Sequence, residues 1–104
     1  MKYQIYYSEQ AEKDIDELFY LITEIYQAPL TAANYVQGIY NEIKTLEYAA
    51  ETYKLETDDF YRQFGFNVRR INYKNTAIIY TVNTNYLYET FVCIRRIMSA
   101  KSVI

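Results

Sequence analysis

Apolar residues recur at helical spacing through the first half of this chain and at strand spacing through the second half. Steps of four and three residues predict an amphipathic helix of about five turns over residues 9–26, with Ser8 as its N-cap. Its apolar stripe consists of Ala11, Ile15, Leu18, Ile22 and Ile25. A change from helical to strand spacing part-way along a chain restricts the fold to one that combines helices with a sheet.

A second helical stripe follows a break at Ala28-Pro29-Leu30, because the residue before a proline is disfavoured in helical geometry. Thr31 is the predicted N-cap of this second helix. Its stripe consists of Ala32, Val36, Ile39, Ile43, Leu46 and Ala50. Two helices of similar length joined by so few residues form an antiparallel hairpin.

Strand-like segments make up most of the remaining chain. Residues 2–7 alternate and predict a short first strand, whereas residues 51–64 predict a polar connection with a short strand near Phe60-Tyr61. Turns at Lys74-Asn75 and Asn83-Thr84-Asn85 separate the later strands, and connections this short permit only an antiparallel meander. These later strands are predicted at residues 65–73, 76–83 and 87–97.

The predicted order of elements is therefore β-α-α-β-β-β. It describes a single α+β domain over residues 1–104, in which an N-terminal helical hairpin packs on one face of a small, mainly antiparallel sheet. The sequence leaves open whether the first strand lies at an edge of the sheet or inside it.

Two of the predicted strands each carry an arginine pair between β-branched residues, as Val68-Arg69-Arg70-Ile71 and Ile94-Arg95-Arg96-Ile97. Side chains alternate between the two faces of a strand, so we expect each pair to send one guanidinium to either side of the sheet. A buried arginine is costly unless a partner stabilises it. The arginines therefore either meet carboxylates within the fold or lie on a face that binds another molecule.

The net charge of −2 conceals an uneven distribution along the chain. Residues 1–59 hold 12 of the 13 acidic residues and four lysines, for a net charge of −8. Residues 60–104 hold seven lysines and arginines and only Glu89, for a net charge of +6. A basic half of this kind suits an anionic partner such as nucleic acid or an acidic peptide. The alternative is that the two halves neutralise each other within the fold.

Missing residue types exclude several kinds of site. Cys93 is the only cysteine and the chain has no histidine, which excludes an internal disulfide, a Cys-His nucleophile and zinc sites built on histidine or on several thiolates. We expect neither a metal nor another cofactor. The N-terminus does not resemble a signal peptide, and no segment has the ~20 apolar residues that span a bilayer. The sequence therefore predicts a cytoplasmic protein without membrane association.

The order of elements and several local motifs resemble the RelE/ParE superfamily of toxins from type II toxin–antitoxin systems. The matching motifs are, in chain order, Tyr3-x-Ile5-x-x-Ser8-x-x-Ala11-x-x-Asp14-Ile15; Ala32/Ala33-x-Tyr35 with Ile39, Ile43 and Leu46; Val68-Arg69-x-Ile71-x-Tyr73 with Ile78-Ile79-Tyr80; and Ile94-x-Arg96-Ile97 followed by Lys101. They are similar to the family's opening strand and first helix, its second helix, its central hairpin, and its last strand with a basic tail. The resemblance covers nearly the whole chain.

The resemblance implies one of two functions within plasmid-stabilisation (addiction) systems. ParE-like members bind and inhibit DNA gyrase without chemistry of their own, whereas RelE-like members bind the ribosome and cleave mRNA. A co-expressed antitoxin neutralises both kinds. A third alternative is an inactive descendant of either branch.

This chain is more similar to the ParE branch. It lacks histidine, has Ala77 where RelE-like chains often carry an arginine, and stops at Ile104, short of the tail where that branch usually places a catalytic tyrosine. RNA cleavage needs an acid and a base near the 2′-hydroxyl, so a non-catalytic inhibitor is favoured and no catalytic residue is assigned. Ser99 stands where ParE-like chains frequently have a histidine, so the chain also departs from the pattern of the branch that targets gyrase.

The charge pattern and the resemblance together predict a basic face that binds the target or the antitoxin. Arg70, Arg95 and Lys101 are expected to be exposed on it, whereas ion pairs with carboxylates are the alternative for Arg69 and Arg96. A tyrosine in the middle of a central strand belongs more often to the core than to a functional surface, and the core is the alternative for Tyr80. The predicted face comprises Arg69, Arg70, Arg95, Arg96, Lys101 and Tyr80.

The expected partners are a cognate antitoxin and DNA gyrase, or alternatively the ribosome and mRNA. The antitoxin should add a hydrophobic segment to the helices or the open sheet face, with its acidic residues meeting the basic half. A homodimer and a toxin–antitoxin hetero-oligomer both remain open.

Overall fold

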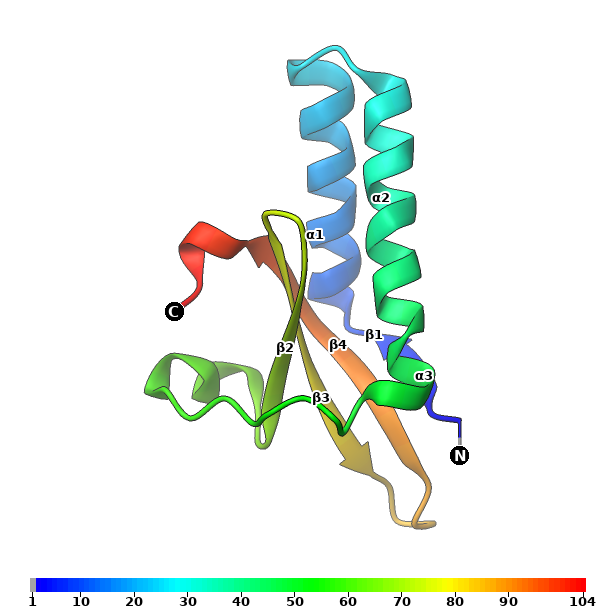
Figure 1. Cartoon of the computed structure of the whole chain (residues 1–104), viewed down its shortest axis with the longest axis vertical. Helices are drawn as coiled ribbons and strands as arrows, with labels where there is room; N and C mark the ends of the chain where they lie inside the picture. Colours follow the sequence, from blue (N-terminus) through cyan, green and yellow to red (C-terminus); the bar gives the residue numbers. More distant parts are fainter. Residues whose placement is uncertain (1) are drawn as a thin grey trace.

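A computed structural model describes residues 2–104 and confirms both the α+β class and the predicted order of elements. Two long helical segments form an antiparallel hairpin that stands over the sheet and projects beyond one end of it (Figure 1). The elements of this half are β1 (Gln4–Tyr7), α1 (Glu9–Tyr20), the π-helical turn η1 (Leu21–Ile25), α2 (Pro29–Lys44) and α3 (Leu46–Ala49). The predicted helix over residues 9–26 therefore corresponds to α1 together with η1.

The start of the first helix is confirmed, and that of the second is corrected. The Ser8 side chain accepts a hydrogen bond from the Ala11 N–H, as expected of an N-cap. The second helix begins at Pro29 with Ala28 as its N-cap. Proline suits the first helical position because its φ is already helical and its missing N–H has no partner there. Thr31 therefore lies inside the first turn and is not the cap.

The sheet has four strands in the order β1-β4-β3-β2. β2 (Val68–Tyr73), β3 (Thr76–Thr84) and β4 (Thr90–Ser99) form the predicted antiparallel meander. β1 pairs with β4 in parallel, from Gln4 opposite Phe91 to Tyr7 opposite Ile94. The first strand thus lies at an edge, which settles the position that the sequence left open.

The segment before β2 differs from its prediction. Asp59–Phe64 forms a 3-10 helix, η2, in place of a short strand near Phe60-Tyr61. The Asp58 carboxylate accepts the Phe60 N–H at 2.9 Å and starts this helix as an N-cap. Gly65 (φ +124°) and Asn67 (φ +53°) then leave the extended region, so β2 begins at Val68 rather than at residue 65.

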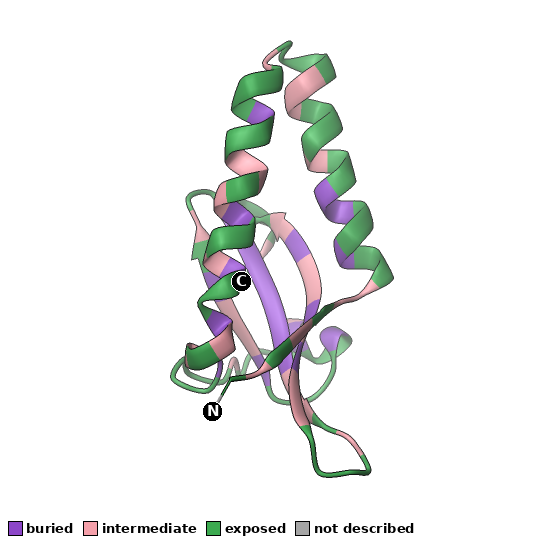
Figure 2. Cartoon of the chain, turned by 90° about the vertical axis from the view of Figure 1, so that its right-hand side faces the viewer, coloured by how far each residue is buried: buried purple, intermediate pink, exposed green. Residues whose placement is uncertain are grey.

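Both faces of the sheet carry a core. The larger core lies where the helical hairpin meets the sheet, and Figure 2 shows the buried stretches concentrated there rather than toward the tip of the hairpin. A smaller core lies on the opposite face, which we call the far face. It is built from Tyr61, Phe64, Val68 and Ile79, with Phe60, Met98 and Val103 packed against them. The sheet is therefore covered by helices on one side and partly covered by η2 and the C-terminal segment on the other.

Helix α2 approaches β2 closely at Gly38. A Cβ atom at this position would overlap the hydroxyl and ring of Tyr73. That ring is held in place, since it makes an edge contact with Tyr35 (centroids 5.2 Å apart) and Lys74 Nζ lies 5.5 Å from its centroid. A residue without a side chain is what lets the helix and the strand meet here.

We expect Gly38→Ala to lower the free energy of unfolding by about 1–3 kcal/mol, because the Tyr73 ring must leave its site. The usual gain of about 1 kcal/mol for alanine over glycine inside a helix should be outweighed. Urea unfolding of the two proteins measures the difference. In a Tyr73→Ala background the same substitution should be neutral or stabilising. Equal stability of the single variant and the wild type would contradict the close approach.

Candidate functional site

Arg96 is held by a carboxylate from helix α1. Its Nε donates to Asp14 Oδ2 at 2.8 Å, and a second guanidinium nitrogen donates to Oδ1 at 3.2 Å. Asp14 also accepts the Ile97 backbone N–H at 2.9 Å and the Gln10 side-chain amide at 3.0 Å. The β1–β4 ladder ends at the pair of Tyr7 with Ile94. Beyond it, the Asp14 carboxylate accepts the Ile97 N–H that would otherwise bond to a neighbouring strand. Arg96 therefore meets a carboxylate within the fold, as one of the two alternatives for this residue predicted, and the ion pair connects α1 to β4.

Asp14 remains ionised in this setting. Burial by itself would raise the pKa of its carboxyl group. The hydrogen bonds from Arg96, Ile97 and Gln10 and the positive charge of Arg96 outweigh burial and hold the pKa below the usual value of 3.8. The pair is thus charged near neutral pH.

The second arginine pair departs from simple alternation because β4 contains a β-bulge. Ile79 pairs with Arg96 and Tyr80 pairs with Ile94, so Arg95 has no opposite residue on β3. Arg95 lies on the far face, where its Nε donates to Thr81 Oγ1 at 3.0 Å. The expectation that this pair sends one guanidinium to each face is therefore wrong: Arg96 turns instead to the edge of the sheet beside α1.

The first arginine pair does alternate as expected. Arg70 lies on the far face, where one guanidinium nitrogen donates to the Tyr61 hydroxyl at 3.0 Å and to the Ile104 carbonyl at 3.2 Å. Arg69 is on the hairpin side and donates to the Tyr53 carbonyl at 2.8 Å. The ion pairs formed among residues 2–104 do not include Arg69, so the carboxylate alternative is not realised for this side chain, whose acceptor is a backbone carbonyl.

Tyr80 belongs to the core and not to a binding surface. Its side chain is 0% exposed, and its hydroxyl donates to the Ala50 carbonyl at 2.6 Å. Burial raises its pKa far above the usual range for a phenol, so the hydroxyl stays protonated. Its assignment to the predicted basic face is wrong, because the alternation of β3 turns this ring toward the helical hairpin.

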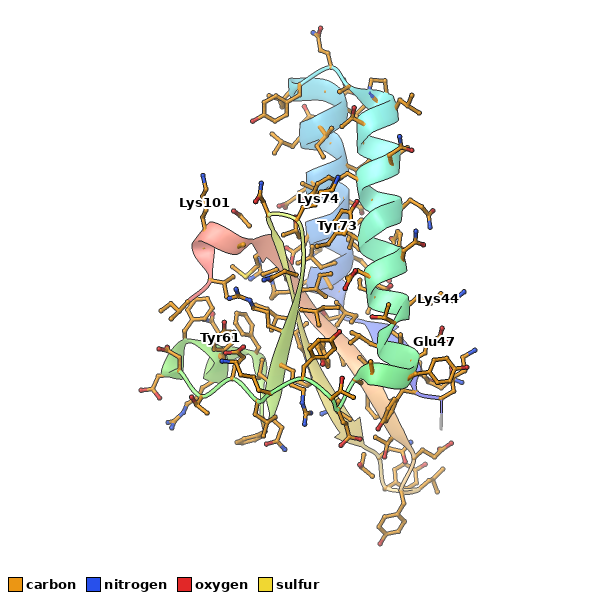
Figure 3. The ribbon with its side chains drawn as sticks, in the orientation of Figure 1. Lys44, Glu47, Tyr61, Tyr73, Lys74 and Lys101 are labelled. Carbon is orange, nitrogen blue, oxygen red and sulfur yellow. The ribbon has the colours of Figure 1, made fainter. Side chains whose placement is uncertain are left out.

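Lys101 lies on the 3-10 turn η3 (Ala100–Ser102) that follows β4 and is exposed. Figure 3 shows its side chain pointing away from the sheet, whereas Tyr61 lies below the same C-terminal segment. The Tyr61 hydroxyl donates to the Ile104 carbonyl, which holds the end of the described chain against the far face. Lys101 therefore stands on a segment that is anchored at Tyr61 and Arg70.

The candidate residues consequently do not form one continuous basic face. Arg70 and Arg95 share the far face, on the strands that flank β3. Arg69 lies on the opposite face, and Arg96 is engaged at the edge of the sheet. The part that Arg70, Arg95 and Lys101 play in binding stays a prediction.

Sequence reasoning missed two residues that organise this region. Asp14 immediately precedes Ile15 and lies three residues after Ala11 on the buried stripe of α1, and an acidic residue on such a stripe signals an internal partner. Tyr61 was expected in a connection, where no pattern marked its hydroxyl as a ligand for Arg70.

Two solved structures share this architecture over nearly its whole length. A chain of the chromosomal ParDE toxin–antitoxin system from P. aeruginosa matches with a TM-score of 0.70 and 19% sequence identity, over 94% of this chain and 96% of its own. A chain of the toxin–antitoxin complex RelBE2 from Mycobacterium tuberculosis matches with a TM-score of 0.58 and 14% identity, over 95% and 99% of the two chains. The fold is RelE/ParE-like.

The likeness resides in the fold, since neither a protein-family model nor a curated protein matches the sequence. The RelE/ParE-like architecture predicted from the order of motifs is confirmed at that level. In this RelE/ParE-like fold the Asp14–Arg96 pair joins the first helix to the last strand. Within residues 2–104, no helix combines the length and the apolar character needed to cross a membrane.

Proposed function

We propose that this chain is the toxin of a type II toxin–antitoxin pair and that it acts by binding and inhibiting DNA gyrase. The observation that carries the proposal is the likeness, over nearly the full length, to chains of two toxin–antitoxin structures. The higher TM-score belongs to the ParDE system, which supports the ParE-like alternative. A cognate antitoxin neutralises the toxin in this proposal.

The state of the candidate residues supports a binding rather than a catalytic role. Tyr80 is buried with its hydroxyl engaged, and Arg96 is engaged by Asp14. The chain has no histidine to serve as a general base. Arg70 donates to the Tyr61 hydroxyl and Arg95 to the Thr81 hydroxyl, and neither pairs with a side-chain carboxylate within residues 2–104, so both can still meet an anionic surface. An acidic segment of the antitoxin fits the same two side chains.

Expression of the chain without an antitoxin tests the proposal. Plasmid topology and the integrity of full-length mRNA are followed in the same cells. Altered supercoiling or cleaved DNA, together with intact mRNA, is the expected result. Normal growth with unchanged DNA and mRNA would point to an inactive descendant and overturn the proposal.

A RelE-like, ribosome-dependent mRNA endoribonuclease is the second candidate. The contact between the Arg70 guanidinium and the Tyr61 hydroxyl favours it, because a phenol beside a cation can take part in phosphate chemistry. That phenol is buried, however, and is engaged by the Ile104 carbonyl. Codon-phased mRNA cuts that appear only during translation would establish this candidate in place of gyrase inhibition.

We expect Arg70→Ala/Arg95→Ala to weaken inhibition of purified gyrase at least tenfold, which corresponds to about 1.4 kcal/mol. A supercoiling assay with purified toxin measures the inhibitory concentration. Arg62→Ala is the matched control, since Arg62 is exposed on η2 and pairs with its near neighbour Asp59. Inhibition that is equally strong in the double variant and in the control would rule out the far face as the target-binding surface.

A further inference from the structure

The turn between β3 and β4 presents large apolar side chains to solvent. Tyr86 and Tyr88 are each 88% exposed and Leu87 is 61% exposed. Turns are normally built from small or polar residues, and Glu89 is the one charged residue between β3 and β4. The turn lies at the end of the molecule opposite the tip of the helical hairpin (Figure 1). Folding of the single chain does not explain why these apolar side chains are exposed.

The turn is ordered by its own hydrogen bonds. The Asn85 side-chain oxygen accepts the N–H groups of Leu87 (2.9 Å) and Glu89 (3.0 Å), and its amide donates to Glu89 Oε1 at 3.2 Å. Tyr88 adopts φ +61° and donates its N–H to the Asn85 carbonyl at 3.0 Å. A rigid turn loses little conformational entropy when it binds, and tyrosines lose less than longer side chains. The apolar tip is therefore preorganised for contact.

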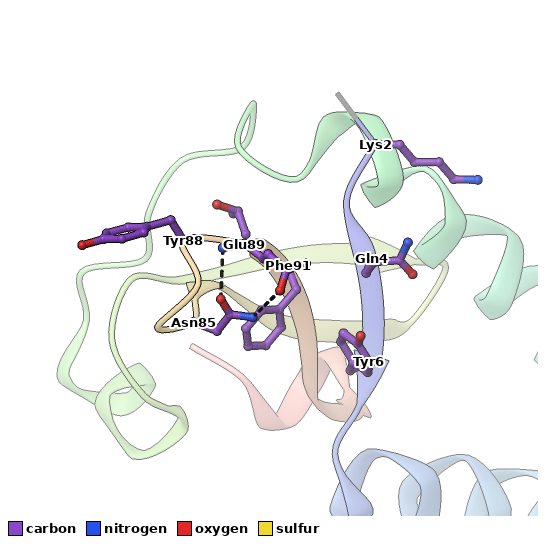
Figure 4. Close-up of a pocket in the computed structure, with 8 residues that line it drawn as sticks. Lys2, Gln4, Tyr6, Asn85, Tyr88, Glu89 and Phe91 are labelled. Carbon is purple, nitrogen blue, oxygen red and sulfur yellow. Dashed lines mark hydrogen bonds between the residues drawn. The ribbon is translucent and has the colours of Figure 1, made fainter.

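A groove lies directly beside this turn. It has a volume of about 680 Å³ and runs between the turn and the first strand (Figure 4). Tyr6 and Phe91 form its apolar floor, with their rings edge to face at 5.6 Å. Figure 4 shows Tyr88 on one side of the groove and Gln4 with Tyr6 on the other. A protruding apolar tip and an apolar groove are thus neighbours on one surface.

We propose that this surface is the interface of a homodimer, in which Tyr86 and Leu87 of one copy enter the groove of the second copy and the reverse contact forms at the same time. A two-fold interface uses the same patch on both copies, so it needs a protrusion and a recess side by side. The Tyr6–Phe91 floor of the second copy receives the tip in this arrangement.

Charge supports a second copy as the occupant. The groove is lined by one cation, Lys2, and one anion, Glu89. In the proposed dimer Lys2 of one copy faces Glu89 of the other, and two-fold symmetry makes this contact twice. Lys2 keeps its contact with Glu47 (3.0 Å) and is still largely exposed. A patch without surplus cations does not favour nucleic acid or an anionic membrane surface.

The exposed area is of the size that a modest dimer needs. Tyr6, Tyr86, Leu87 and Tyr88 together expose on the order of 500 Å², taking about 200 Å² for each fully exposed aromatic side chain. A standard interface buries about 800 Å² on each partner. With the polar rim of the groove added, we expect a dissociation constant on the order of 10 μM.

Sedimentation velocity of the purified chain, from about 1 μM to about 500 μM, tests the proposal. The wild type should pass from monomer to dimer, and Tyr86→Ser/Tyr88→Ser should raise the dissociation constant at least tenfold. Tyr20→Ser/Tyr26→Ser is the matched control, because it removes two exposed tyrosines from the tip of the helical hairpin. Circular dichroism verifies that both variants are folded. A wild type that stays monomeric, or a dimer weakened by the control instead, would overturn the proposal.

A mixing experiment tests the reciprocal charge pair separately. The single variants K2E and E89K each place like charges across the two-fold axis, so each should dimerise less than the wild type. Mixed in equal amounts they restore two opposite-charge pairs and should form heterodimers at about the wild-type concentration. Mixtures that associate no better than the separate variants would contradict the reciprocal arrangement.

Discussion

Asp14→Ala should lower the free energy of unfolding by about 2–4 kcal/mol. The substitution leaves the Arg96 guanidinium without its ion pair and the Ile97 N–H without its acceptor. Removing one partner of a fully buried pair costs about 3–5 kcal/mol, and the partial exposure of Arg96 reduces that figure because water can solvate the cation. Urea unfolding followed by circular dichroism measures the loss.

Asp16→Ala is the matched control for this prediction. Asp16 lies on the same helix but is exposed, and a surface substitution of this kind should change stability by no more than about 0.5 kcal/mol. Equal losses of stability in both variants would contradict a specific contribution of the Asp14–Arg96 pair, because alanine has the higher helix propensity and propensity alone would not destabilise either variant.

The contribution of Asp14 should also depend on pH. Because its pKa is lower in the folded than in the unfolded chain, its carboxylate stabilises the fold above the unfolded-state value near 3.8, and this contribution is lost as the pH falls through the folded value. The difference in unfolding free energy between the wild type and Asp14→Asn should be constant from about pH 7 to about pH 5 and shrink below about pH 4. A difference that persists undiminished at about pH 2 would contradict the depressed pKa.

Tyr80→Ala should destabilise the chain by about 3–5 kcal/mol, because it leaves a large cavity between the sheet and the helical hairpin. Tyr80→Phe should cost only about 1–2 kcal/mol, since it keeps the ring and leaves the Ala50 carbonyl without its donor. Thermal unfolding of the two variants measures both effects, with Tyr48→Ala on the exposed side of α3 as the control.

The same pair of variants separates a structural from a functional role for Tyr80. A buried hydroxyl cannot touch a target, so under the proposed function a folded Tyr80→Phe variant should inhibit purified gyrase as strongly as the wild type. Full loss of that inhibition in a stable Tyr80→Phe variant would return this residue to the set of site candidates.

The fold could be predicted largely because the spacing of apolar residues along the chain specifies its helices and strands. The stripe from Ala11 to Ile25 and the short turn at Lys74-Asn75 specify a helix and a hairpin whatever surrounds them. The 3-10 helix at Asp59–Phe64 was not predicted, because six residues are too few to show a helical spacing of apolar side chains. In the sequence, its N-cap Asp58 cannot be distinguished from other acidic residues of a loop.

The site was harder to predict because its geometry depends on a single extra residue. A β-bulge shifts every following side chain by one position, and nothing in Ile94-Arg95-Arg96-Ile97 reveals that Arg95 is unpaired. Tyr80 stands in a run, Ile78-Ile79-Tyr80, whose members are all buried, so alternation alone could not separate a surface from a core face. In contrast, Asp14 on the stripe of the first helix was a readable signal.

The edge position of β1 also has a consequence for synthesis. Gln4 pairs with Phe91, and Asp14 contacts a residue 82 positions further along the chain. Contacts this distant in sequence form late, because the intervening chain must first be ordered. While the ribosome is still making β4, β1 has no strand to pair with and Asp14 lacks its ion-pair partner Arg96. We therefore expect a nascent or truncated chain that stops before β4 to remain without a finished surface, so that recognition of any partner begins only when synthesis is nearly complete.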